Sequence, residues 1–445
     1  MAKLFLKGLK LAIIFSVIII TSNSVKAQME CRSMLGAHLT PFKKNIPILW
    51  AIEGTMAPGI MTSPFTDSEN TTLNGGMVLA ALDFTILKKH NIYIEGGYKN
   101  WKNSELVDEI TNKSRHFGVR QVFYSFEKNT FKIKLGLHET KLGDFYLVDE
   151  RILGASIDKE FGAFTFNLRG GTVMKNFARM GQFCTNRHLY GILNPDYTEN
   201  IGKKPGETNL AGFVINWNPN YKKEKINSDD NLNNTDEFSD FSTDDEFSDI
   251  EENSDKNKIN ISNIALLIYN EFGSIIPDHK LYTGLMMEIK LPYEFLIQTG
   301  GIYQKLNNNN TIVFIAALGK NIGWNNGSNT MINGAFIGKI DIDENALFQP
   351  LFSNLFIGEV MRLDATDFPL WQSEIKHNFS GKLKLHFALK AVGQIKGNKT
   401  NEQDIELGFK TFKNHLKLSA ILSRVETIAF VKDLYMARLE VRIAF

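Results

Sequence analysis

The chain has 445 residues, of which 43% are hydrophobic and 22% are charged, and its formal net charge is +1 at pH 7. Its two cysteines, Cys31 and Cys184, exclude a disulfide-rich scaffold and leave open whether a single bridge forms. The sequence has no clustered basic helix, so we expect no nucleic-acid partner.

The N-terminal region carries the features of a secretory signal peptide. Three lysines precede the apolar run Leu11–Ile20, which is too short to cross a bilayer. Small residues up to Ala27 place a cleavage site before Gln28. We therefore expect residues 1–27 to be removed and residues 28–445 to form one exported domain. The alternative is an anchor helix that stays in the membrane. No later stretch has the roughly 18 consecutive apolar residues of a transmembrane helix.

Alternation of apolar and polar residues with period two recurs along residues 28–445, and it is typical of strands with one apolar face. Each run is about 9–13 residues long, which suits a tilted strand that crosses a bilayer. Strands of soluble sandwiches are commonly about five or six residues long. The clearest apolar faces lie in Val78–Ile86, Phe131–Leu137, Phe164–Leu168, Leu281–Ile289 and Leu383–Ala391.

Short turns and longer links alternate between these runs, as in a transmembrane β-barrel. We expect about 18 strands, within a range of about 16–18, from Pro47–Gly54 to residues 433–445. Residues 342–369 are assigned to a loop, because a further strand there would put the termini at opposite ends of the barrel. The expected short turns are Lys88–Asn91, Glu127–Thr130, Gly162, Leu291–Tyr293, Asn378–Gly381 and Lys413–His415, and the longer links lie near 57–75, 102–114, 141–150, 174–207 and 395–402.

An acidic insert interrupts the strand pattern. Residues 228–255 contain twelve Asp or Glu and no Lys or Arg. A segment with so much charge of one sign cannot bury enough apolar surface to offset its chain entropy, so we expect residues 225–258 to be disordered. Calcium binding is the alternative, but the spacing does not match an EF-hand loop. The strand count places the insert on the short-turn side. Without it, residues 28–445 carry nine more basic than acidic residues.

Catalytic and metal-binding motifs are not found in the sequence. The nine histidines are scattered, and no zinc-protease helix, nucleophile elbow or phosphate-binding loop is present. The segment Cys184–Gly191 brings Cys, Arg and His together, which leaves a Cys–His nucleophile as an alternative to a polar surface loop. We expect no enzyme activity, no cofactor and no metal site.

In the final segment, Leu434–Phe445, every second residue from Tyr435 to Phe445 is apolar, and three of the four residues Met436, Arg438, Glu440 and Arg442 between them are charged. The segment resembles the C-terminal strand of Gram-negative outer-membrane β-barrel proteins, which end on Phe with apolar residues at every second position upstream. In that family this strand closes the barrel and is recognised by the barrel-assembly machinery. The residues that match this assembly signal are Tyr435, Leu439, Val441, Ile443 and Phe445.

The resemblance, together with the strand number, implies an all-β, porin-like transmembrane antiparallel barrel in the outer membrane, surrounded by lipid. A barrel of this size is too wide for side chains to fill, so it would hold a water-filled or loop-plugged pore. We therefore expect a channel for small polar solutes or ions. The alternative is a non-conducting barrel that serves assembly, secretion or surface attachment. The oligomeric state is left open.

Basic residues that alternate with the apolar faces are the candidates for lining the lumen. Lysine and arginine rings favour anions, so we expect a mild anion preference at low salt. The alternative is that these residues are solvated wall residues without a role in selectivity. The candidates are Lys132, Lys134, Lys382, Lys384, Lys390, Arg438 and Arg442.

The segment Met361–Trp371 is the candidate for an inward-folded loop that narrows the pore. It combines the charged residues Arg362, Asp364 and Asp367 with aromatic residues. In porin-like barrels, charges on such a loop set selectivity. The alternative is an outer loop that places Trp371 at the membrane boundary.

Overall fold

A computed structural model gives the fold of the chain. None of the helices that it describes is long and apolar enough to cross a membrane. The residues described are 33–42, 47–62, 71–87, 89–102, 115–143, 147–174, 201–221, 259–276, 278–307, 309–344, 346–348, 350–353, 369–381, 383–397, 399–411, 414–428 and 431–445.

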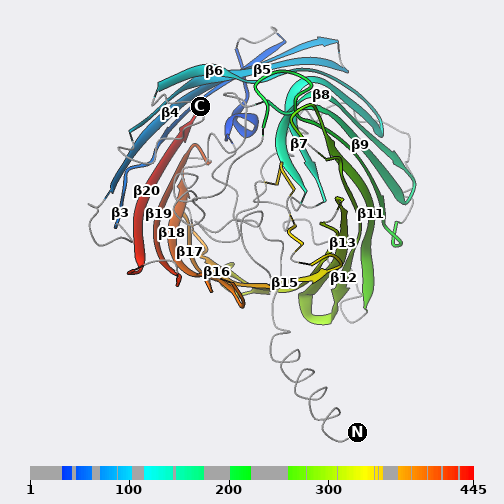
Figure 1. The fold of residues 1–445 in the computed structure, drawn as a ribbon. Helices are drawn as coiled ribbons and strands as arrows, with labels where there is room; N and C mark the ends of the chain where they lie inside the picture. The colour runs from blue at the N-terminus through cyan, green and yellow to red at the C-terminus, as the bar shows by residue number, and fades with distance from the viewer. Residues whose placement is uncertain are drawn as a thin grey trace, which may run out of the picture.

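These residues form one antiparallel sheet that closes on itself into a barrel (Figure 1). From Thr71–Leu87 onward each strand pairs with its neighbour in sequence, and the last strand, Leu434–Ala444, pairs with Ile48–Met56 and Gly59–Met61 near the start of the chain. The strands are β1 (Thr40–Pro41), β2 (Ile48–Met56), β3 (Gly59–Met61), β4 (Thr71–Leu87), β5 (His90–Lys102), β6 (Arg115–Lys128), β7 (Phe131–Leu142), β8 (Val148–Phe161), β9 (Phe164–Thr172), β10 (Asn209–Trp217), β11 (Asn260–Phe272), β12 (Lys280–Leu291), β13 (Phe295–Lys305), β14 (Thr311–Gly323), β15 (Asn329–Asp341), β16 (Leu370–Asn378), β17 (Lys384–Gln394), β18 (Asn401–Thr411), β19 (Leu416–Glu426) and β20 (Leu434–Ala444).

The barrel wall has 18 strands among the described residues, which confirms the predicted number. Strands β2 and β3 occupy one position in the wall, because both pair with β4 on one side and with β20 on the other. Proline has no backbone N–H, and Pro58 lies at the break between them. Strand β1 has two residues, which pair with Leu49 and Trp50 of β2, and it is not counted as a strand of the wall. The described part of residues 342–369 contains no further wall strand, as predicted.

The tight turns lie where the alternation predicted them, at one end of the barrel. Asn129 and Asn414 adopt the left-handed conformation that such turns require, and so does Gly162. The connection between β10 and β11 starts from the same end, as predicted for the acidic insert, whose own residues lie outside the described part of the chain. The long link expected at residues 57–75 is shorter than predicted. Residues at both ends of this range belong to the wall, as β3 and as the first residues of β4.

Successive side chains in the wall point alternately outward and inward. Val78 is 54% exposed on the outer face, whereas its neighbour Leu79 is completely buried. Leu439 is 39% exposed, and the adjacent Glu440 is buried inside. Apolar residues thus cover the outer face, as a lipid environment requires, and charged residues concentrate on the inner face.

The seam between the first and last strands closes the barrel. Strand β20 pairs with β2 from Glu53↔Ala444 to Met56↔Val441. Beyond the break it pairs with β3 up to Met61↔Met436. At the short-turn end, the backbones of Ile52 and Phe445 exchange two hydrogen bonds of 2.8 Å each. The terminal segment therefore closes the wall, as its resemblance to the C-terminal strands of outer-membrane barrels implied.

Candidate functional site

The end of the β7–β8 hairpin leaves the wall and folds into the barrel. Strand β6 pairs with β7 only as far as Leu137, and β9 pairs with β8 only from Leu153 onward. The strand residues between these points, within 138–152, pair with each other and not with β6 or β9. Both faces of this part are shielded, since Ile152 and Arg151 point to opposite sides and are both buried. We call residues 138–152 the inner hairpin; β7 lies within the ring of strands in Figure 1.

The sequence contained a signal for this departure that the strand pattern alone did not reveal. Glu139 and Lys141 continue the register of Leu135 and Leu137, the residues expected to face lipid. A charged side chain near the bilayer midplane costs about 2–4 kcal/mol for Lys or Arg. Two consecutive charged residues in the lipid-facing register therefore indicate that the strand has left the lipid-facing wall.

A second element, formed by the described residues between 346 and 353 in the link from β15 to β16, also lies inside the barrel. The Phe348 ring makes an edge contact with the Tyr282 ring, with the centroids 5.9 Å apart. Phe352 forms a bridge with Val148 of the inner hairpin, so the two inward elements touch each other. The Leu351 N–H donates a hydrogen bond of 2.8 Å to the Glu271 carboxylate. We call this element the inward loop.

The inward loop and the inner hairpin cover an apolar patch of the inner wall. Such a patch would be unfavourable in contact with water, and the two elements remove it from solvent. The patch includes Leu267, Tyr282, Ile302, Val313 and Ile337, packed with Leu142, Phe348 and Phe352.

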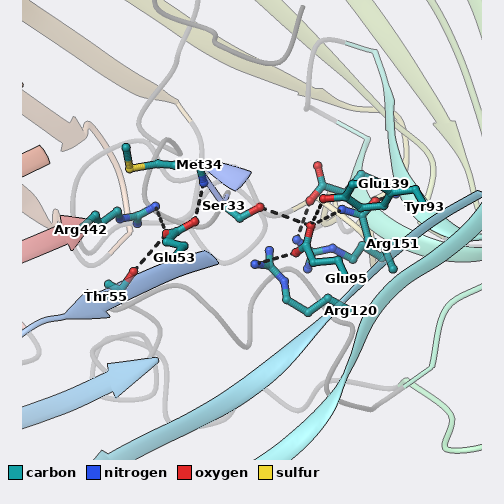
Figure 2. Close-up of polar contacts among 11 residues, drawn as sticks. Ser33, Met34, Glu53, Thr55, Tyr93, Glu95, Arg120, Glu139, Arg151 and Arg442 are labelled. Carbon is teal, nitrogen blue, oxygen red and sulfur yellow. Dashed lines mark hydrogen bonds and ion pairs between the residues drawn. The ribbon is translucent and has the colours of Figure 1, made fainter. Parts of the chain in front are cut away.

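The other side of the interior carries charged groups in pairs (Figure 2). Glu95 accepts from Tyr93 at 2.7 Å and forms an ion pair with Arg120 at 3.1 Å. On the inner hairpin, Arg151 pairs with Glu139 at 2.6 Å. We define the paired cluster as Glu53, Glu95, Glu139, Arg120, Arg151 and Arg442.

The paired cluster contains as many carboxylates as guanidinium groups, so its formal charges cancel. Arg442 lies at 3.9 Å from Glu53 and also binds Glu440 beside it. Burial of these charges is tolerated because each has a partner of opposite sign. With three carboxylates and three guanidinium groups held in fixed positions, the cluster can orient a passing dipole.

A group of lysines lies among carboxylates on strands β16–β19. Lys376 interacts electrostatically with Lys390 and Lys417 and with the carboxylates of Glu374 and Glu406. The Glu406 carboxylate lies 3.7 Å from the Lys390 ammonium group and 3.1 Å from the His386 ring. We call Lys376, Lys390 and Lys417 the lysine group. The sequence prediction included Lys390 and missed Lys376 and Lys417, although Lys417 lies between the apolar Leu416 and Leu418 of β19.

The remaining lumen candidates occupy different surroundings. Lys132 is 40% exposed and pairs with Glu127 at 3.0 Å beside a tight turn. The Lys134 ammonium lies 5.2 Å from the centre of the Phe123 ring, and Lys384 is exposed at the start of β17. Arg438 and Arg442 lie on the buried, inner face of β20. Their role in selectivity stays a prediction, and Lys382 lies outside the described residues.

The proposed assembly signal lies mainly on the outer surface. Tyr435, Leu439, Ile443 and Phe445 are exposed, and Val441 is half-buried. The loop candidates Arg362, Asp364 and Asp367 lie outside the described residues, as does Cys184–Gly191. Within the described part of the chain, no three His, Cys, Asp or Glu side chains are grouped closely enough to hold a metal ion.

Comparisons with known proteins were made at the level of sequence and of structure. No family profile and no curated protein matches the sequence. Among solved structures, OccAB4 of Acinetobacter baumannii is similar at 10% identity and a TM-score of 0.54, over 91% of this chain and 100% of that one. A BenF-like porin from Pseudomonas fluorescens gives 9% identity and a TM-score of 0.53, over 91% and 100% of the two chains. OccK5 (OpdH) of Pseudomonas aeruginosa is similar at 8% identity and a TM-score of 0.54, over 89% of this chain and 98% of that one.

At these identities the likeness concerns the fold alone. It extends over nearly the whole length of both chains, so the entire barrel is matched rather than a group of strands. The chain therefore has the 18-stranded fold of outer-membrane porins, as the sequence pattern and its terminal strand predicted.

Proposed function

We propose that this protein is an outer-membrane channel through which small polar solutes or ions diffuse. The observation that carries the proposal is the set of charged side chains inside a closed barrel, above all the paired cluster and the lysine group. Charged groups inside a membrane protein are costly unless they face partners or water. A solute with polar groups would meet both the paired cluster and the lysine group on its way along the barrel axis.

The apolar outer face supports a location in a lipid bilayer, and the expected signal peptide supports the outer membrane. The fold is that of porins, and the solved neighbour described as a BenF-like porin has the same architecture. We further propose that the barrel-assembly machinery recognises Tyr435, Leu439, Val441, Ile443 and Phe445.

The second candidate function is a barrel without a conducting pore. The inner hairpin and the inward loop favour it, because both occupy space inside the barrel. Such a protein would act in assembly, secretion or surface attachment.

Single-channel recording of the purified chain in planar bilayers separates the two candidates. Discrete, salt-dependent conductance steps are expected of the channel. Stable insertion without such steps would reject it and favour the second candidate. Insertion is checked separately by recovery in the outer-membrane fraction and by a shift in gel mobility on heating. Recovery as a soluble periplasmic protein would reject the outer-membrane location.

A further inference from the structure

The N-terminal residues before the first wall strand enter the barrel. Residues 33–42, which we call the strap, comprise Ser33 and Met34, the 3-10 helix η2 (Leu35–His38), Leu39, β1 and Phe42. The short helix lies within the ring of strands in Figure 1. The strap precedes β2, so it reaches the interior from the short-turn end.

The first two residues of the strap donate hydrogen bonds to the paired cluster (Figure 2). The Met34 backbone N–H donates to the Glu53 carboxylate at 2.6 Å. The Ser33 hydroxyl donates to the Glu95 carboxylate at 3.5 Å, a weaker contact. Glu53 and Glu95 are 0% and 1% exposed, so the strap lies where a solute would otherwise meet these two carboxylates.

The helix of the strap is fixed by apolar packing on the inner wall. Leu35 is completely buried, and Leu39 packs against the same cluster. The wall residues beneath are Ala51, Met77, Leu79, Ala81 and Tyr93, on the inward face of β2, β4 and β5. This patch faces the barrel interior, and the strap keeps it from water much as the inward loop covers the larger patch elsewhere on the wall.

The far end of the strap lies at the seam. The His38 ring lies against the His415 ring, with the centroids 4.6 Å apart. Beyond it, Thr40 and Pro41 pair with Trp50 and Leu49 at the start of β2. The strap is therefore held at three places: at the carboxylates, at the apolar patch and at the seam.

We propose that the strap is an internal plug that fills part of the pore, limits its conductance and keeps Glu53 and Glu95 from passing solutes. The proposal rests on the proposed channel function for its conductance, but not for the position of the strap. The occupant is a segment of this chain, bound through one N–H donor, one hydroxyl donor and a buried leucine.

A deletion tests the plug without changing the charge. Residues 28–42, QMECRSMLGAHLTPF, include the whole strap and contain one Glu and one Arg, so removing them leaves the formal charge of the expected mature chain at pH 7 as it was. A larger unit conductance of the deleted channel would then reflect a wider path. An unchanged conductance would overturn the proposal, provided that heat-modifiable gel mobility shows an assembled barrel.

A point substitution tests the hydrogen bond to Glu53. Proline has no N–H, and Met34 has a φ of −85°, close to the range that proline allows. Met34→Pro therefore removes the donor, whereas Met34→Ala keeps it and serves as the matched control. The expected order of conductance is deletion above Met34→Pro, with Met34→Ala equal to the parent. An equal effect of Pro and Ala would assign the role to the side chain and contradict the hydrogen-bonded anchor.

Thiol labelling tests the strap independently of current. Cys31 and Cys184 are first replaced by Ser, and Leu79→Cys then places a thiol beneath Leu35. A charged thiol reagent should label this residue slowly in the parent and several-fold faster after deletion of residues 28–42. Lys384→Cys, exposed at the start of β17, should label equally in both.

The combined outcomes separate the plug from the channel. If deletion speeds the labelling of Leu79→Cys, and only the deleted chain conducts, the result would support the plug. The channel function would then belong only to the chain without the strap. Faster labelling without any conductance would support the strap position and reject the channel. No change in the labelling of Leu79→Cys would reject the plug, whatever the current.

Discussion

The Leu351 backbone N–H and the Glu271 carboxylate, 80 positions apart in the chain, meet at 2.8 Å inside the barrel. The same carboxylate accepts the Tyr269 hydroxyl at 3.0 Å. A buried acidic group thus connects the wall to the inward loop. The loop is held further by Gln304, whose amide donates to the Leu347 carbonyl at 2.8 Å.

Glu271→Leu should loosen the inward loop. It leaves the Leu351 N–H and the Tyr269 hydroxyl without this acceptor, and an unsatisfied buried donor costs about 1–3 kcal/mol. We expect a lower temperature for the heat-modifiable gel shift and noisier open-channel current. Glu294→Leu, at an exposed tight turn, is the control. Equal behaviour of the two variants would show that the loop does not depend on Glu271.

Lys376→Glu combined with Lys390→Glu should reduce or reverse the predicted anion preference. The lysine group brings three positive charges together beside the carboxylates of Glu374 and Glu406, and reversing two of them changes the local charge by four units. The reversal potential across a KCl gradient measures the preference. It should be largest at low salt, because the Debye length falls from about 10 Å at 0.1 M to about 3 Å at 1 M. Lys432→Glu, exposed beyond β19, is the control; a shift as large in this variant would place the selective field elsewhere.

Arg442→Leu should destabilise the seam. It removes a guanidinium group that pairs with two buried carboxylates, those of Glu53 and Glu440. Removing one partner of a buried ion pair typically costs about 3–5 kcal/mol, because the remaining charge is left without compensation. Denaturant unfolding in lipid vesicles measures the loss. Adding Glu440→Leu should restore part of the stability, and a double variant no better than the single one would contradict this pairing.

Acidification should weaken the hold of the strap at the seam. Burial, together with the neighbouring His415, lowers the pKa of His38 below its ordinary value of 6.5, and the Asn414 backbone opposes this only in part. The bound strap therefore takes up fewer protons than the released one, so its stability is full above pH 6.5 and is lost as the pH falls below it. As the pH falls from about 8 to about 5, the conductance of the parent, taken relative to that of the strap-deleted channel, should rise. His38→Phe should flatten this dependence, and an unchanged profile in that variant would assign it to another group.

Deletion of residues 228–255 should leave a folded barrel. The segment joins β10 to β11, which pair independently with their neighbours β9 and β12. Heat-modifiable mobility and conductance of the shortened chain measure this. Loss of assembly would show that the acidic segment has a structural role.

The fold was predictable because the bilayer imposes one rule on every strand. Alternation identified the outward faces, such as that of β4 with Val78, and the strand number followed from the turns. The same rule does not predict which segments of the chain fold into the barrel interior. Phe348 and Phe352 lie in a loop without periodicity, and their partners Tyr282 and Val148 are distant in sequence, so alternation cannot place them.

The candidate site was predictable only in part, for a related reason. Alternation put Arg438 and Arg442 on the inner face, where the structure has them. It gave no means of pairing Arg442 with Glu53, because that contact depends on how the two ends of the chain meet. The strap was missed because Leu35 and Leu39 form too short an apolar pattern to indicate where they pack.

The position of the strap also has a consequence for the order of events during assembly. Met34 and Glu53 are 19 residues apart, and Ser33 and Glu95 are 62 apart, so these contacts require only the first strands. The contact of His38 with His415, like the pairing of Glu53 with Ala444, requires the last ones. Contacts between near neighbours in sequence cost less loop entropy and form earlier. A segment that settles on the early strands is enclosed when the ring closes, and it never has to thread into a finished pore.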